Sequence, residues 1–173
     1  MKDYIVQFSG LILGNYTFEF RLEKRFFDHI ESDEFLNGDV KLDVFLLKSE
    51  TMMEFNFVFE GTVQCICDRC LEEFMLPIKG EHSLFVKFGG EYQEVDDEII
   101  VLPIKEHQID LYPFIHDFLM TSMPLQKIHA EDKEGNSGCN MDMIQRINDN
   151  QQKTEEEIDP RWEKLNILKN NNK

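Results

Sequence analysis

Four cysteines and one histidine are the residues of this 173-residue chain whose types and spacing best suit chemistry. Cys67 and Cys70 form a C-x₂-C pair, a spacing that lets two thiolates reach one tetrahedral ion from a tight turn. A closed zinc site needs four ligands, and His129 and Cys139 are the nearest candidates elsewhere. The nine residues between them exceed the usual finger spacing. The sequence predicts a zinc site at Cys67, Cys70, His129 and Cys139 that joins two distant segments.

The same cysteines allow two other interpretations, a redox pair and inert thiols. A thioredoxin-like site would place the motif between a strand and a helix, whereas strand-like sequence lies on both sides here. Cys65 is expected to be a small core residue. The spacings alone support no Ser-His-Asp or Cys-His catalytic set. The remaining histidines are expected to be satisfied or solvated, since the sequence gives them no partner: His29, His82, His107 and His116.

Most of the first hundred residues show the alternation typical of half-buried strands. Phe55, Phe57 and Phe59 share one face of an expected strand, because side chains on a strand alternate between its faces. A turn is expected at Asn37-Gly38, and the acidic stretch 91–98 is expected to be a solvated loop, not a metal site. The other expected elements are a short apolar segment at 4–9, a short helix within 23–31, strands at 16–22, 40–48, 52–63, 74–78 and 82–88, and a last strand at 99–104.

From residue 110 the apolar period becomes that of a helix. Asp110 stands where an N-cap belongs, Pro113 falls in the first turn, and Pro124 can stop the helix. Its core face is Leu111, Phe114, Ile115, Phe118 and Leu119. A loop is expected at 131–138, a short helix at 141–148, and a terminal helix from residue 159 whose Trp162 either packs on the domain or anchors a partner.

Strands followed by helices predict an α+β fold. The expected architecture is a mostly antiparallel β-sheet, or a partly open barrel, in the first two thirds and helices in the last third. A chain of this length buries roughly 70% of its unfolded surface. We expect a single domain over residues 1–169 and a frayed tail at 170–173.

The charge balance restricts the partners. The chain carries 18 Lys and Arg against 34 Asp and Glu, a net charge of −16 and a pI of about 4.6. Such a protein repels phosphate backbones, so direct binding to bare RNA and to anionic membranes is disfavoured. No signal peptide and no apolar run of membrane-spanning length is visible in the sequence, which favours a cytoplasmic protein.

Several motifs in this order resemble the YceD family, the large ribosomal RNA subunit accumulation proteins of bacteria and plastids. They are CDRCLE at 67–72, YPF at 112–114, Pro124-Leu125, Cys139 and DPRWEKL at 159–165. The resemblance implies a non-enzymatic role in the synthesis, processing or stability of large-subunit ribosomal RNA, with no small-molecule substrate. Many relatives hold a second cysteine pair that completes a four-cysteine zinc site, whereas this chain offers Cys139 alone, with His129 as the substitute.

Charge and resemblance together lead to one functional hypothesis. Residues 131–163 hold ten acidic and four basic side chains, a surface attracted to basic proteins more than to RNA. We therefore expect an acidic adaptor in ribosome biogenesis whose partner is a basic ribosomal protein or a large-subunit precursor particle. The alternatives are a thiol- or zinc-dependent redox enzyme and a stress-linked protein-interaction module.

Overall fold

The computed structural model describes residues 2–30, 35–131 and 137–155. They belong to two compact units. Unit 1 comprises Met1–Ile66 and Glu73–Lys127, and unit 2 comprises Cys67–Glu72 and Ile128–Lys173. The terminal helix expected from residue 159, with Trp162, and the tail at 170–173 lie outside the described residues. The single domain over residues 1–169 stays a prediction.

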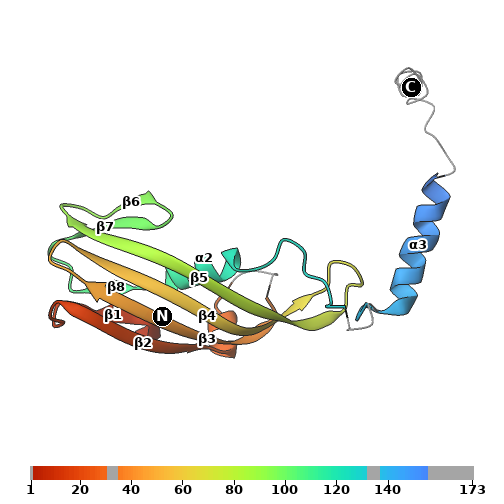
Figure 1. The fold of residues 1–173 in the computed structure, drawn as a ribbon, viewed down its shortest axis with the longest axis horizontal. Coiled ribbons are helices and arrows are strands. Elements are labelled where there is room, and N and C mark those ends of the chain that lie inside the picture. The colour runs from red at the N-terminus through yellow and green to blue at the C-terminus, as the bar shows by residue number, and fades with distance from the viewer. Residues whose placement is uncertain (1, 31–34, 132–136, 156–173) are drawn as a thin grey trace, which may run out of the picture. The chain divides into compact units, whose positions relative to one another are not determined.

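Unit 1 is built on a six-stranded sheet with the strand order β2-β3-β4-β5-β7-β6 (Figure 1). Neighbouring strands are antiparallel, except that β5 and β7 are parallel, and the sheet is not closed into a barrel. The α+β class is therefore confirmed, with a mixed sheet. The strands are β2 (Gly14–Leu22), β3 (Asn37–Lys48), β4 (Met52–Ile66), β5 (Glu73–Gly89), β6 (Gln93–Asp96) and β7 (Ile99–Pro103).

Short elements complete unit 1. A second, two-stranded sheet pairs β1 (Ile5–Gln7) with β8 (Gln108–Asp110). The helical elements are the 3₁₀ turn η1 (Lys2–Tyr4) and the helices α1 (Lys24–Phe27) and α2 (Tyr112–Thr121). Helix α1 lies within the segment 23–31 that the sequence predicts to be helical. Among the described residues, no helix has the length and apolar character needed to cross a membrane.

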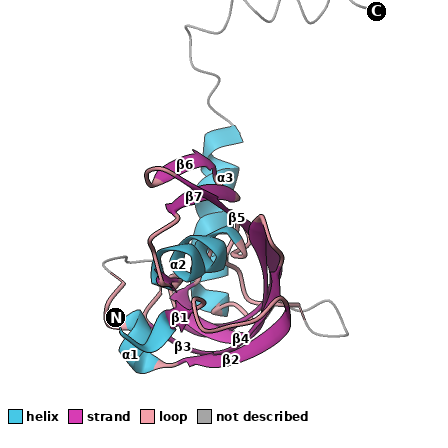
Figure 2. Ribbon diagram, turned by 90° about the vertical axis from the view of Figure 1, so that its left-hand side faces the viewer, coloured by secondary structure: helices cyan, strands magenta, loops and turns pink. Residues whose placement is uncertain are grey.

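The core lies on one face of the six-stranded sheet. The alternating pattern of β4 buries Phe55, Phe57 and Phe59 completely, as predicted. Helix α2 lies on the concave side of the curved sheet (Figure 2). Its Phe118 ring meets Phe57 edge-on, with the ring centroids 5.1 Å apart and the planes at 63°. This aromatic contact joins the helix to the centre of the sheet.

Helix α2 follows the sequence prediction closely. Leu111, Ile115, Phe118 and Leu119 are buried, whereas Phe114 is half-buried. The predicted N-cap was wrong by one residue, since Leu111 holds that position without a side-chain cap. Asp110 Oδ1 still accepts the backbone N–H of Tyr112, the first residue of the helix, at 2.9 Å. The helix ends at Thr121, before Pro124.

Two glycines explain where the predicted strand boundaries were wrong. Asn37-Gly38 opens β3 and is not a turn. Glycine is needed at position 38 for packing, because a Cβ there would lie 2.5 Å from the Phe27 ring. The segments 74–78 and 82–88 form one continuous strand, in which Gly80 leaves room for Ser122. These glycines serve close packing and do not interrupt the strands.

Two short strands were missed. The segment 99–104 is not the last strand, since β8 follows it with three residues, too few to show an alternating pattern. Part of the acidic stretch 91–98 forms β6, whose four residues are all exposed. The stretch is therefore solvated, as expected, but it is not wholly a loop.

Candidate metal centre

The first half of the candidate site is the tip of the β4–β5 hairpin, residues 67–72 in unit 2. The backbone N–H of Cys67 donates to the carbonyl of Glu72, and that of Leu71 donates to the carbonyl of Cys67, both at 2.9 Å. Leu71 takes a φ of 63°, in the left-handed region. This conformation costs a non-glycine residue about 1 kcal/mol and persists where surrounding contacts fix it. The strained turn folds the chain back so that Cys67 and Cys70 enter one cluster.

The second half is the segment around residues 128–140, also in unit 2. Gly138 donates its backbone N–H to the carbonyl of Ala130 at 3.3 Å, which brings His129 and Cys139 close together. Asn140 donates its side-chain amide to Glu72 Oε1 at 2.6 Å, and its Oδ1 accepts the N–H of Asp142 at 2.9 Å. Asn140 thus ties the segment to the hairpin tip and caps helix α3 (Met141–Glu155), which is longer than the predicted 141–148.

The structure brings the four predicted ligands together. One ligand atom from each of Cys67, Cys70, His129 and Cys139 lies within 4.8 Å of the other three. The sulfurs of Cys67 and Cys139 are 3.8 Å apart, and Cys70 Sγ is 3.5 Å from His129 Nδ1. A tetrahedral zinc ion with Zn–S of about 2.3 Å and Zn–N of about 2.0–2.1 Å requires edges of about 3.8 and 3.6 Å. Both distances match those of a tetrahedral zinc site.

Burial shields the three sulfurs of the cluster from solvent. Cys67, Cys70 and Cys139 are 0%, 2% and 5% exposed, and His129 is half-buried. None of the cysteines is in a disulfide. Around a tetrahedral ion, three thiolates and a neutral imidazole would leave no open position for a substrate, which is the arrangement of structural zinc sites.

The pKa values of two of the cysteines are shifted in opposite directions, and only the shift of Cys67 favours the thiolate that binds a metal. Burial raises the pKa of Cys67, but the backbone N–H groups of Cys70, Arg69 and His129 and the His129 ring, which hydrogen-bond to its sulfur, outweigh burial and lower this pKa to about 6. For Cys139, the Ser137 hydroxyl lowers the pKa, and burial together with the sulfurs of Cys67 and Cys70 raises it above its ordinary value. Zinc binds the thiolate, so loading the site releases protons.

The remaining thiol and histidines have structural surroundings. Cys65 is fully buried in β4 and belongs to the core, as expected. His29 Nδ1 lies 2.9 Å from the carbonyl of Arg25, and His116 Nδ1 lies 2.8 Å from Asp117 Oδ1. These side chains are satisfied and lie outside the cysteine cluster.

His82 and Ser122 form a close pair whose geometry is structural. Ser122 donates its hydroxyl to the carbonyl of Phe118 at 2.7 Å, so at 2.8 Å it accepts from His82 Nε2. A nucleophilic serine would instead donate its proton to the histidine. The His82 ring also stacks on Phe118, with centroids 4.8 Å apart and an interplanar angle of 2°. The pair holds α2 against β5.

This packing predicts a pH-dependent stability. Burial lowers the pKa of His82 below 6.5, so the folded state favours the neutral ring. Its contribution is complete above pH 6.5 and is lost as the pH falls from there to the folded-state pKa. We expect the loss to be small, because the ring is half-buried and keeps some contact with water. Urea unfolding between pH 5.5 and 7.5 should show a shallower decline for His82→Gln than for the unchanged protein. Parallel curves would contradict this role.

Comparison with known proteins gives one match. The family model described as "Large ribosomal RNA subunit accumulation protein YceD" matches residues 55–169, a range that includes both halves of the cysteine-histidine cluster. No curated protein and no solved structure matches the chain. The matched range is more than half of the sequence, and the chain therefore belongs to the YceD family.

Proposed function

We propose that this protein supports the accumulation of large-subunit ribosomal RNA without enzymatic activity, as an acidic adaptor in the cytoplasm. The family match over residues 55–169 carries the proposal, because the family is described by that role. The net charge of −16 supports the adaptor mechanism. Bare RNA repels the protein because both are negatively charged. Basic ribosomal proteins attract it, and this electrostatic attraction also speeds their association with it.

Zinc has a structural part in this proposal. Cys67, Cys70, His129 and Cys139 would hold one ion, and their buried, closed arrangement supports a crosslink and not a reaction centre. Binding of the ion would stabilise the hairpin tip and the segment that leads into α3. The binding free energy of such a site becomes folding free energy, since the unfolded chain holds no preformed site.

Binding measurements at physiological salt test the adaptor mechanism. The full chain should co-sediment with large-subunit precursor particles and should bind purified basic ribosomal proteins at least about tenfold more tightly than protein-free large-subunit RNA. Its depletion should lower the ratio of large-subunit to small-subunit RNA in cells. Tight binding to the RNA alone, with no ribosomal protein present, would contradict the adaptor mechanism.

A redox function is the second candidate, because the pKa of Cys67, at about 6, suits a thiolate nucleophile. The 0% exposure of Cys67 opposes it, since a redox partner must reach the sulfur. Alkylation of the folded protein separates the two functions. Rapid labelling of Cys67 together with reduction by thioredoxin would favour redox chemistry, and labelling only after a chelator is added would favour structural zinc.

A further inference from the structure

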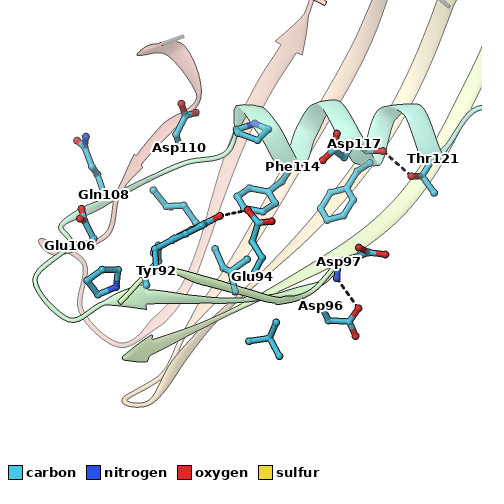
Figure 3. A pocket seen from close by; sticks show the side chains of 17 residues that line it. Tyr92, Glu94, Asp96, Asp97, Glu106, Gln108, Asp110, Phe114, Asp117 and Thr121 are labelled. Carbon is cyan, nitrogen blue, oxygen red and sulfur yellow. Dashed lines mark hydrogen bonds between the residues drawn. The ribbon is translucent and has the colours of Figure 1, made fainter. Parts of the chain in front are cut away.

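Unit 1 contains a groove that the candidate metal centre does not use. Its volume is about 1010 Å³, at the upper end of the range for ligand pockets, so several side chains of a bound segment fit within it. The lining comes from β6, β7, β8 and α2 and from the loops beside them. Figure 3 shows Tyr92 and Glu94 on one side of this space and Phe114 and Asp117 of α2 on the other.

The charged side chains of the groove all have one sign. Its lining contains no lysine, arginine or histidine. His116 contacts Asp117 from outside the lining, and Lys105 precedes a lining residue in sequence. A cation entering the groove therefore meets a strongly negative potential. The acidic residues are Glu94, Asp96, Asp97, Glu106, Asp110 and Asp117.

The rest of the lining is apolar and aromatic. Ile100, Leu102 and Phe118 form a buried floor, and Val95 and Tyr92 are 56% and 53% exposed at the rim. The hydroxyl of Tyr92 donates to Glu94 Oε1 at 2.6 Å and fixes that carboxylate beside the aromatic ring. The groove thus combines two chemistries, apolar contact and negative charge.

Strand β6, which borders the groove, lies at the edge of the six-stranded sheet and pairs with β7 alone in it. Its four residues are all exposed. An edge strand offers backbone groups with which an extended peptide can pair. The groove is therefore suited to a segment in extended conformation.

We propose that this groove binds an extended segment of a ribosomal protein in which lysine or arginine alternates with leucine or phenylalanine. The carboxylates receive the cationic side chains, and the floor receives the apolar ones. RNA does not meet the charge requirement, because its phosphates would face the six carboxylates. The inference rests on the proposed adaptor function and identifies the groove as the surface that binds the partner.

A labelled peptide tests this assignment on the full-length protein. The probe is a fluorescent 12-residue peptide of alternating arginine and leucine, measured by anisotropy from 50 to 200 mM salt. The groove variant is Glu94→Gln/Asp97→Asn/Asp117→Asn, which retains the carboxylates of Asp96 and Asp110 that accept backbone N–H groups. The matched control removes the same charge from exposed positions outside the lining: Glu19→Gln/Glu50→Gln/Glu81→Gln.

We expect the groove variant to bind the peptide at least about tenfold more weakly at 50 mM salt, with a shallower salt dependence, and the control to lose less than about threefold. A peptide in which serine replaces every leucine should bind at least about fivefold more weakly. Equal losses in the two variants would overturn the proposal, because net charge alone would then attract the peptide. Preferred binding of single-stranded RNA would overturn it as well.

The failure of this inference differs from the failure of the adaptor function. If the groove variant binds the peptide as the unchanged protein does, while the unchanged protein still co-sediments with large-subunit precursors, the adaptor function stands and its surface lies elsewhere. If the unchanged protein does not co-sediment, the adaptor function fails first.

Discussion

Zinc is expected to leave the protein when Cys139 is replaced by serine. The full chain should carry about one zinc ion after loading with zinc alone, and Cys139→Ser should lower its affinity by at least about 100-fold. Loss of an outer-shell partner already costs about 10–100-fold, and Cys139 would be a direct ligand. Elemental analysis after dialysis measures the loss. Cys67→Ser should lose zinc equally, because one ion would join both segments.

The loss of zinc from Cys139→Ser should also destabilise the two segments of unit 2 that the ion would join. Structural zinc in small peptides contributes about 10–16 kcal/mol of apparent binding free energy, which is folding free energy for the segments it joins. Hydrogen exchange should therefore lose protection at the backbone N–H groups of Leu71 and Gly138 in Cys139→Ser. Cys65→Ala is the matched control, since Cys65 is buried two residues from Cys67 and lies outside the cluster. Zinc retained by Cys139→Ser at full stoichiometry would contradict the four-residue site.

Phe57→Ala is expected to destabilise unit 1 by about 3–5 kcal/mol, the usual cost of removing a buried aromatic side chain. Phe57 is fully buried in β4 and contacts the rings of Phe55 and Phe118. The substitution leaves a cavity between the sheet and α2 and removes the aromatic contact that joins them. Urea unfolding followed by the β-sheet circular dichroism signal measures the change in the free energy of unfolding.

Phe45→Ala is the matched control for this prediction. Phe45 lies on the adjacent strand β3, opposite Asn56, and is 45% exposed. Its truncation should cost about 1 kcal/mol or less, since much of the ring already contacts water. Equal costs at positions 45 and 57 would show that the core does not lie on the face that the alternation of β4 assigns to it.

The sequence predicted the candidate ligands because ligand chemistry does not depend on distance along the chain. Cys67 and Cys139 are far apart in sequence, yet three cysteines and one histidine are a ligand set that tetrahedral zinc binds. The turn that makes the site was not predictable in detail. A left-handed backbone is expected at glycine, and this turn places Leu71 there.

The strong periodic elements were also predictable. The alternation around Phe57 and the helical period around Ile115 each extend over enough residues to define a face. Strand β8 was missed because three residues carry no period, and its pairing with β1 is set by tertiary contacts. The groove was not predictable either, since its lining comes from separate elements that only the fold brings together.

X-ray absorption at the zinc edge tests most directly the claim that two remote segments hold one ion. Measured on the full chain loaded with zinc, the spectrum should give three sulfur ligands at about 2.3 Å and one nitrogen at about 2.0–2.1 Å. That shell requires Cys67 and Cys70 from the hairpin tip together with His129 and Cys139. A shell of oxygen ligands, or no zinc bound at stoichiometric concentration, would contradict the claim.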